Sequence, residues 1–193
     1  MSSAALYAGI PNLQAAPALP AGKILPCQES LALAPTRPLT LRRGIGWLKF
    51  RSVKDVAPAL AYLTLPHLVN IASISQLQKS ALLVPIPLHY RRQRVRGFNQ
   101  AEEITRAIHM YTNIPFSNLL ARPRATHAQA RLPHELRQQN ISGAFSITHQ
   151  VPHKARHLIL VDDVTTSGST LSAAAQALLP TEAQIWGLTV AGG

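Results

Sequence analysis

Two adjacent carboxylates, Asp162 and Asp163, are followed closely by a run of small and hydroxyl-bearing side chains. Backbone N–H groups in a loop of small residues can approach an anion closely, and hydroxyl groups add further donors. A pair of carboxylates can accept hydrogen bonds from a vicinal diol, such as the 2′ and 3′ hydroxyl groups of ribose. The pattern therefore predicts a site for a ribose 5-phosphate. The residues of the run are Thr165, Thr166, Ser167, Gly168, Ser169 and Thr170.

The segments on either side of this motif predict a strand and a helix. Residues 158–161 are all apolar, which is typical of a buried strand in a parallel sheet. Residues 171–179 are alanine-rich and end before Pro180, which predicts a helix. The positive end of that helix would face the loop, at the carboxyl end of the strand where open α/β sheets bind ligands. An ordinary strand–turn–helix unit with Asp163 as a helix cap is the alternative interpretation.

Residues 161–170 resemble the phosphoribosyl-pyrophosphate (PRPP) binding motif of type I phosphoribosyltransferases. They read Val-Asp-Asp-Val-Thr-Thr-Ser-Gly-Ser-Thr, with Ser167 where the family has a second Thr. The resemblance implies an α/β fold, with a central, mostly parallel sheet flanked by helices and a small N-terminal hood. It also implies that residues 165–170 hold the 5-phosphate and that Asp162 and Asp163 hold the ribose hydroxyl groups. The expected cofactor is Mg²⁺, which the two aspartates would contact only through water.

A second strand and a cluster of basic residues precede the motif. Residues 81–87 predict a buried strand that is ended by prolines. Gly97 permits a backbone turn, and Asn99 with Glu102 has the spacing of a capping box for a helix over about residues 100–111. Arginine suits bidentate phosphate binding, so the cluster predicts a diphosphate site, with a plain basic surface loop as the alternative. The cluster comprises His89, Arg91, Arg92, Arg94 and Arg96.

This second unit resembles the ComF branch of the phosphoribosyltransferases, whose members are associated with DNA uptake in natural competence. The resemblance rests on residues 84–88 (Val-Pro-Ile-Pro-Leu), the arginine cluster and residues 96–101 (Arg-Gly-Phe-Asn-Gln-Ala). It implies that the diphosphate lies near Arg91, Arg92, Arg96 and Gly97. It also implies that the polar stretch 122–140 is a mobile loop that closes over the substrates. Further matches are Leu48-Lys49-Phe50, Thr126, Gln129, Leu132, Arg137, Asn140 and Gly143-Ala144-Phe145.

The N-terminal part of the chain has a different character. Residues 1–44 are rich in Ala, Pro and Leu, and their prolines preclude a long helix, so we expect an irregular segment ahead of a phosphoribosyltransferase-like domain over residues 45–193. ComF members commonly carry an N-terminal zinc ribbon with several pairs of cysteines. Cys27 is the single cysteine of the chain, so we expect this zinc module to be absent or degenerate.

Three further elements are predicted. A helix follows from about Val53 to Leu63, with Val56, Leu60 and Leu63 on one face, and residues 143–148 and 182–191 predict strands. Lys49 and Arg51 lie in a basic stretch before this helix. A solvated basic face is the favoured interpretation of that stretch, and a contact with the ligand anion is the alternative.

Composition limits the class of protein. The formal net charge is +11, which favours polyanionic partners, and 47% of the residues are hydrophobic, which is enough for a packed core. No apolar run is long enough to span a membrane, and the N-terminus lacks the pattern of a signal peptide. With the single cysteine, these features favour a cytoplasmic protein that does not insert into a membrane.

Two functions of different classes follow. The first is Mg²⁺-dependent transfer of ribose 5-phosphate from PRPP to a nitrogen nucleophile, an unknown nucleobase or amine, with a link to DNA uptake. The second is a module without turnover that senses PRPP or binds single-stranded DNA through its basic face. Aromatic residues make up only 5% of the chain, which disfavours an extended base-stacking platform. The sequence does not indicate the oligomeric state.

Overall fold

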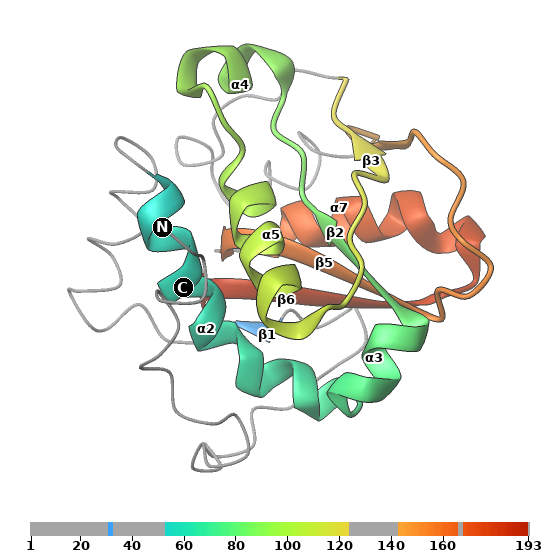
Figure 1. Ribbon diagram of the computed structural model, residues 1–193. Coiled ribbons are helices and arrows are strands. Elements are labelled where there is room, and N and C mark those ends of the chain that lie inside the picture. Colours follow the sequence, from blue (N-terminus) through green and yellow to red (C-terminus); the bar gives the residue numbers. More distant parts are fainter. Residues whose placement is uncertain (1–30, 33–52, 124–142, 166–167, 193) are drawn as a thin grey trace.

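The computed structural model describes residues 31–32, 53–123, 143–165 and 168–192 (Figure 1). Four parallel strands form its central sheet in the order β1–β6–β5–β2. The predicted α/β class, with a parallel sheet flanked by helices, is confirmed. The first strand lies within the segment that was predicted to be irregular, and the rest of residues 1–44, including Cys27, lies outside the described residues. The strands are β1 (Leu31–Ala32), β2 (Ala81–Pro85), β5 (His157–Thr165) and β6 (Gln184–Gly192).

The central strand β5 is longer than its apolar run predicts. Its ladder with β6 continues past Val161, because Asp162 pairs with Thr189 and Val164 pairs with Ala191. The acid pair was expected at the end of the strand, and the strand runs on to Thr165 because the backbone goes on pairing after the apolar side chains stop. The acid pair thus lies on regular, hydrogen-bonded backbone.

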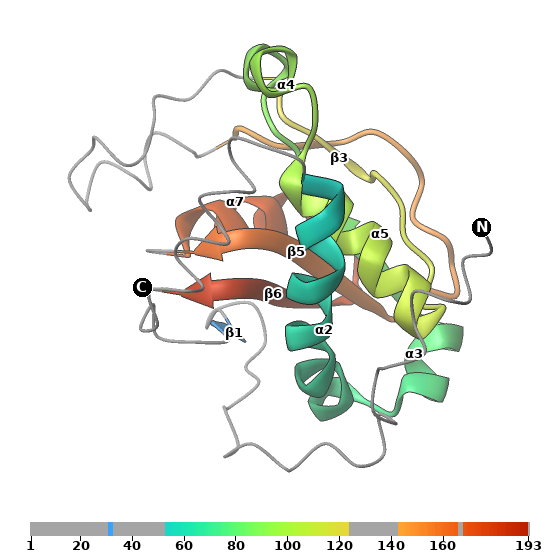
Figure 2. The same cartoon turned by 60° about the vertical axis from the view of Figure 1, so that its left-hand side comes forward.

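Helices cover both faces of the sheet (Figures 1 and 2). Alternate residues of the strands point to opposite faces, so Leu83 and Ile159 pack with α2 and α5, while Leu82 and Leu158 pack with α7. Both faces are therefore buried, which explains why β2 and β5 read as continuous apolar runs. The helices are α2 (Val53–Ile71), α3 (Ile74–Ser80), α4 (Tyr90–Arg96), α5 (Gln100–Thr112) and α7 (Ser169–Leu178).

The helix α2 also extends beyond its prediction. It continues to Ile71 and contains Pro58 and Pro66. Leu60 is buried and Val56 is half-buried, as expected, but Leu63 is 48% exposed. The prediction for Leu63 was wrong because the buried face runs through other residues of the longer helix: Ala57, Leu60, Ala61, Leu65 and Leu68.

A second, two-stranded sheet is separate from the central sheet. β3 (Leu120–Ala121) and β4 (Ser146–Ile147) are antiparallel, and Leu120 pairs with Ile147. The strand predicted over residues 143–148 is confirmed for its middle part, and β6 matches the strand predicted over residues 182–191. A short 3-10 helix, η4 (Leu179–Thr181), follows α7 where Pro180 was expected to end the helix.

Within the described residues, no single helix is long and apolar enough to cross a membrane. One bent pair, Val56–Val69 with Ile74–Ser80, meets the criterion by length and composition only, and its two helices are inclined by 95°.

Candidate functional site

Asp162 and Asp163 lie near the carboxyl end of β5, and both are half-buried. One carboxylate oxygen of Asp162 accepts a hydrogen bond from the backbone N–H of Asp163 at 2.9 Å. Asp163 accepts one in the same way from Val164 at 2.8 Å. Each bond engages one oxygen of its carboxyl group, and a carboxylate offers about four acceptor positions. The pair can therefore still accept hydrogen bonds from a diol.

The two carboxyl groups share a crowded environment. Burial raises the pKa of Asp162 well above its ordinary value, and the negative charge of Asp163 raises it further. Such a pair is stabilised by hydrogen-bond donors or by a nearby cation. The ribose hydroxyl groups would supply donors and a hydrated Mg²⁺ would supply charge, so the residues present fit both groups.

The loop predicted to bind phosphate leads from β5 into α7. Thr165 ends the strand, and its Oγ1 accepts a hydrogen bond from the backbone N–H of Gly168 at 3.1 Å. Gly168 has a φ of 68°, in the left-handed region that glycine adopts without strain, and it precedes the first residue of α7. Ser169 is buried and Thr170 is half-buried at this helix start, where the backbone favours an anion. Two members of the loop lie outside the described residues: Thr166 and Ser167.

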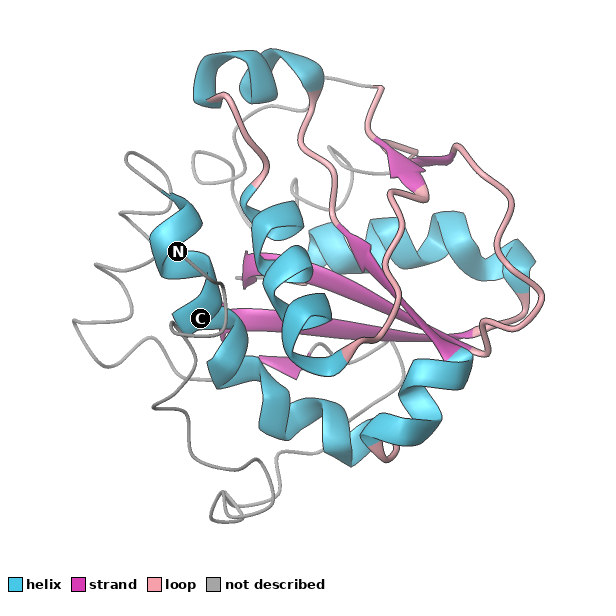
Figure 3. Cartoon of the chain, in the orientation of Figure 1, coloured by secondary structure: helices cyan, strands magenta, loops and turns pink. Residues whose placement is uncertain are grey.

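The basic cluster forms the short helix α4 rather than a loop, so the expectation of a loop was wrong. Figure 3 shows α4 joined to the body by a loop at either end. The helix begins because Nδ1 of His89 accepts a hydrogen bond from the backbone N–H of Arg91 at 3.3 Å, and it ends at Gly97, whose φ is 79°. His89, which the sequence analysis grouped with the arginines of the basic cluster, is buried and caps the helix. The turn expected at Gly97 is confirmed.

The arginines of α4 divide into an exposed and a half-buried pair. The guanidinium carbons of Arg91 and Arg94 lie 5.8 and 5.9 Å from the centroid of the Tyr90 ring. The Nε of Arg91 also donates a hydrogen bond to the Tyr90 hydroxyl at 3.1 Å. Arg92 and Arg96 are half-buried. Of the three arginines expected near a diphosphate, Arg91 thus turns toward Tyr90 instead.

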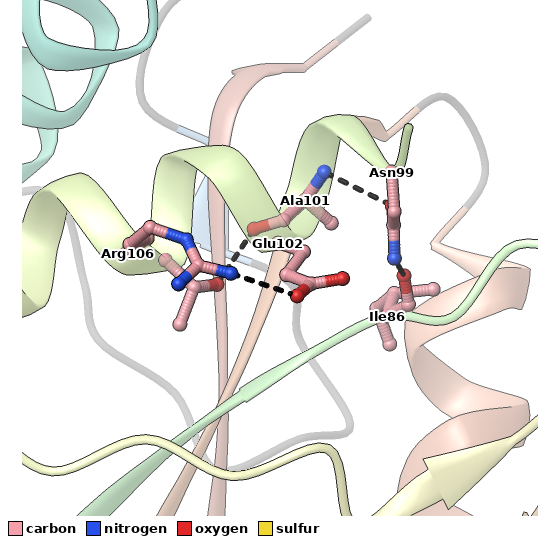
Figure 4. Close-up of polar contacts among 6 residues, drawn as sticks. Ile86, Asn99, Ala101, Glu102 and Arg106 are labelled. Atoms are coloured by element: carbon pink, nitrogen blue, oxygen red, sulfur yellow. Dashed lines mark hydrogen bonds and ion pairs between the residues drawn. The ribbon is translucent and has the colours of Figure 1, made fainter. Parts of the chain in front are cut away.

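Asn99 ties the start of α5 to the end of β2 (Figure 4). Its Oδ1 accepts a hydrogen bond from the backbone N–H of Ala101 at 3.2 Å, and its Nδ2 donates one to the carbonyl of Ile86 at 3.0 Å. The predicted cap at Asn99 is confirmed. The predicted partner in a capping box, Glu102, instead accepts a hydrogen bond from Nη2 of Arg106 at 3.0 Å. Glu102 therefore pairs with Arg106, one turn further along the helix, and not with the backbone of Asn99.

Arg122 links the acid pair to the arginine cluster. It follows β3, only 8% of its surface is exposed, and its guanidinium carbon lies 5.4 Å from the centroid of the Phe145 ring. Burial lowers the pKa of Arg122, the positive charge of Arg92 lowers it further, and the carboxyl group of Asp162 opposes both effects. In turn, Arg122 lowers the pKa of Asp162. A buried cation therefore lies within electrostatic reach of both parts of the site.

A cavity of about 370 Å³ opens beside Arg122, between the end of β2, α4, the start of α5 and β3. Its walls are partly apolar and partly polar, which is typical of ligand sites. The polar side chains that line it are Tyr90, Gln93, Asn99, Glu102, Asn118 and Arg122.

Comparison with known proteins gives the family. No protein family model matches the chain. The chain is 34% identical to DNA utilization protein YhgH of Escherichia coli (strain K12) over 176 residues, which are 87% of the chain and 76% of that protein. Competence protein F of Haemophilus influenzae is 36% identical over 120 residues, or 58% of the chain and 52% of that protein. Competence protein ComFC of Bacillus subtilis is 30% identical over 101 residues, or 52% of the chain and 39% of that protein. The chain belongs to the ComF family.

The ComF pattern in the sequence did not single out Arg122. The residue had been placed in the polar stretch 122–140 without a role of its own. A signal was present, because Arg122 directly follows the apolar residues Leu119, Leu120 and Ala121, and a charged residue at the end of a buried segment usually has a partner. The partners themselves, Asp162 and Phe145, are distant in the sequence and become evident only in the fold.

Other residues of the ComF pattern lie outside the described part of the chain. The ladder between β3 and β4 pairs Ala121 with Ser146, so the described residues on either side of this part of the chain lie side by side. Arg122 directly follows β3 and Phe145 directly precedes β4, and the two are in contact. The site residues and alternatives that lie outside are Gln129, Arg137, Asn140, Lys49 and Arg51.

In the part of the chain that the structure describes, no group of three or more His, Cys, Asp or Glu side chains could hold a metal ion. A cation at Asp162 and Asp163 would need further ligands from water or from a bound substrate.

Proposed function

We propose that this ComF protein has the type I phosphoribosyltransferase fold, binds PRPP with Mg²⁺ and transfers ribose 5-phosphate to a nitrogen nucleophile. The observation that carries the proposal is the position of Arg122, whose charge acts on Asp162 and is acted on by Arg92. One buried cation thus interacts electrostatically both with a residue expected to bind ribose and with a residue expected to bind diphosphate. The alternative interpretation, an ordinary strand–turn–helix unit, does not explain such a cation.

Each part of the substrate has a suitable partner. The start of α7, with Ser169 and Thr170, offers backbone N–H groups and hydroxyl groups to the 5-phosphate. Asp162 and Asp163 accept hydrogen bonds from the ribose hydroxyl groups. Arg92, with Arg96 and Gly97 close by in sequence, provides positive charge for the diphosphate. When bound, Mg²⁺ neutralises charge on the leaving diphosphate.

The reaction needs little acid–base chemistry from the protein. The nitrogen atom of the acceptor attacks C1 of ribose, the bond between C1 and the diphosphate oxygen breaks, and diphosphate leaves with the bonding electrons. The proton that the nitrogen loses passes to water or to a nearby carboxylate. The arginines stabilise the charge that develops on the leaving group, which is electrostatic catalysis. A loop that closes over the site would exclude water from C1.

The names of the relatives suggest the process in which the protein acts. They are called DNA utilization and competence proteins. We propose on this basis that the present protein also takes part in DNA uptake or in the use of incoming DNA, within the cytoplasm.

Isothermal titration calorimetry of PRPP with Mg²⁺ tests the ribose-phosphate site. We expect the wild type to bind and the double variant Asp162→Asn/Asp163→Asn to lose binding by at least about tenfold, since charged hydrogen bonds contribute roughly 1.5–3 kcal/mol each. Glu103→Gln is the matched control, because Glu103 is a half-buried acid on α5 that does not line the cavity. A folded wild type that does not bind PRPP would overturn the proposal.

A second candidate function has one specific observation in its favour. Tyr90 is 52% exposed and carries Arg91 and Arg94 around its ring. An exposed aromatic ring close to two cations suits a stacked base and two phosphates of single-stranded DNA. Binding of an oligonucleotide that weakens with salt, and is lost in Arg91→Gln/Arg94→Gln while PRPP binding is kept, would support this function.

A further inference from the structure

We propose that the outward face of α2 is a contact surface between two copies of this chain, which meet there in a weak, symmetric dimer. The surface, the α2 stripe, consists of apolar residues on one side of the helix. None of them lines the cavity or belongs to the acid pair or the basic cluster, so the inference does not depend on the transfer of ribose 5-phosphate. The residues of the α2 stripe are Ala59, Tyr62, Leu63, Pro66 and Val69.

Helical geometry brings these residues together. Successive residues of a helix turn by about 100°, so positions 59, 62, 63, 66 and 69 fall within about 120° of one another. Leu63 and Val69 are 48% and 49% exposed, Ala59 is exposed, and Tyr62 and Pro66 are half-buried. The buried residues of α2 belong to the core on the sheet side of the helix. The helix α2 thus has one apolar face in the core and a second apolar face toward solvent.

This second face departs from what a surface helix normally shows. The outward face of such a helix usually carries charged and polar side chains. Residues 56–78 contain no Asp, Glu, Lys or Arg, although 14% of the chain is charged. Apart from the hydroxyl group of Tyr62, the α2 stripe has no polar side-chain group. A contiguous, exposed apolar surface of this kind marks a contact site.

The neighbouring helix α5 supports the α2 stripe. The two helices lie side by side on one face of the sheet (Figures 1 and 2). The rings of Tyr62 and Tyr111 pack edge to face, with their centroids 6.2 Å apart, and Met110 beside Tyr111 is 55% exposed. Tyrosine and methionine are both enriched at protein interfaces. The contact with Tyr111 holds the Tyr62 ring in place, and a preformed surface loses less entropy on binding.

Charge indicates which partner the α2 stripe fits. The chain has a formal net charge of +11, so two copies repel each other when their basic surfaces approach. At the α2 stripe they can meet without placing like charges opposite each other. A lipid surface fits less well, because helices that bind anionic membranes carry Lys or Arg around the apolar side, and residues 56–78 have neither. An acidic protein partner would find no cation there to pair with.

The size of the α2 stripe sets the strength of the contact. The helix has 19 residues, so a strip roughly 28 Å long and about 10 Å wide covers on the order of 300 Å² on each copy. A standard interface covers about 800 Å² on each partner, so we expect a dissociation constant of about 10–100 μM. Pairs of identical subunits commonly have two-fold symmetry. Leu63 and Pro66 lie at the middle of the α2 stripe and would therefore lie near the axis.

Sedimentation velocity of the full chain from about 2 to about 300 μM, in about 0.1 M and about 0.5 M NaCl, tests the inference. Leu63→Glu places two negative charges near the axis, and Leu63→Lys places two positive charges there. Leu179→Glu is the matched control, because Leu179 is an exposed leucine in η4, which follows α7 on the other face of the sheet. Thermal unfolding checks that each variant is folded.

We expect the wild type and Leu179→Glu to dimerise at the upper end of this concentration range, and Leu63→Glu to dimerise at least about tenfold more weakly. A mixture of Leu63→Glu and Leu63→Lys should associate more tightly than either variant alone, because opposite charges then meet near the axis. Dimerisation of the wild type should strengthen with salt, which screens the repulsion between two basic copies.

Three results would overturn the inference. The first is a wild type that stays monomeric up to about 300 μM, well above the expected dissociation constant. The second is a folded Leu63→Glu variant that dimerises like the wild type, or a mixture of the two Leu63 variants that associates no better than either alone. The third is a dimer that weakens as salt is added, since ion pairs outside the α2 stripe would then hold it together.

Discussion

The guanidinium carbon of Arg122 lies 5.4 Å from the centroid of the Phe145 ring, although twenty-two positions separate the two residues in the sequence. Arg122 directly follows β3 and Phe145 directly precedes β4, so the contact lies at the end of this strand pair. Both residues are buried. A cation held over an aromatic ring keeps a defined position, and here its charge lowers the pKa of Asp162.

We expect Phe145→Leu to weaken binding of PRPP with Mg²⁺ by about threefold to tenfold, because a cation–π contact contributes roughly 0.5–2 kcal/mol and fixes Arg122. Calorimetric titration measures the change. Phe116→Leu is a matched control, since Arg106 lies 5.6 Å from the Phe116 ring, is exposed and is not among the groups that shift the pKa of Asp162. Equal PRPP affinities for the two folded variants would show that the Arg122 contact has no role in the site.

Binding of PRPP with Mg²⁺ should weaken on acidification at a pH above the ordinary range of aspartate. Burial and the charge of Asp163 raise the pKa of Asp162, so its carboxyl group takes up a proton at a higher pH than an ordinary aspartate does. The protonated group accepts hydrogen bonds from the ribose hydroxyl groups less well. Arg122→Met removes a charge that lowers this pKa, and the transition should move to higher pH. Titration across a pH series checks both statements. The exposed Arg106→Met should leave the transition in place, and a shift of equal size there would contradict the assignment.

Asp163→Asn should increase the free energy of unfolding at about pH 7 by on the order of 1 kcal/mol, as substitutions at strained functional sites often do. The folded-state pKa of Asp162 is raised, so stability that is present at low pH is lost as the pH rises through that pKa. Removing the neighbouring charge lowers the folded-state pKa and reduces this loss. Urea unfolding measures the free energy of unfolding of the variant and of the wild type. The difference between the two should be smaller at about pH 4 than at about pH 7. A variant that is less stable at neutral pH would refute this account.

Gly97→Ala should destabilise the protein by about 1 kcal/mol, because a φ of 79° costs an L-residue roughly 1–2 kcal/mol. No atom lies within 4 Å of an added Cβ, so backbone strain alone sets this cost. Gly97→Asn should cost less, since Asn tolerates this conformation and Asn113 adopts it with a φ of 54° after α5. Urea unfolding of both variants measures the difference. If Ala and Asn cost the same, steric strain at this φ is not the cause.

The parts of the fold that the sequence predicts are those in which one local pattern decides the structure. The apolar runs that became β2, β5 and β6 are buried on both faces, so their composition alone indicates strands of a parallel sheet. The acid pair and the start of α7 follow directly from the ends of such segments. Asn99 was also predictable, because a helix cap depends on residues close in sequence.

The parts that were missed depend on contacts between distant residues. β3 has two residues and exists because Leu120 pairs with Ile147 across the predicted mobile loop. The role of Arg122 follows from that pairing, since it brings the residue to Phe145 and Asp162. α4 was expected to be a loop between β2 and α5, whereas the cap from the buried His89 ring starts a helix there. Glu102 could equally have paired backward with the cap or forward with Arg106, and sequence spacing allows both.

Residues 115–117 lie along the outer edge of β2 and affect how the sheet can pair with other chains. The backbone N–H of Leu83 donates to the carbonyl of Pro115 at 2.9 Å, and the N–H of Ser117 donates to the carbonyl of Leu83 at 3.0 Å. This bridge covers the outer border of β2, which would otherwise expose a row of backbone groups. Proline has no N–H to offer, so the new border is short and a poor template for a further strand. Protection from edge-to-edge aggregation is thus built into this side of the sheet.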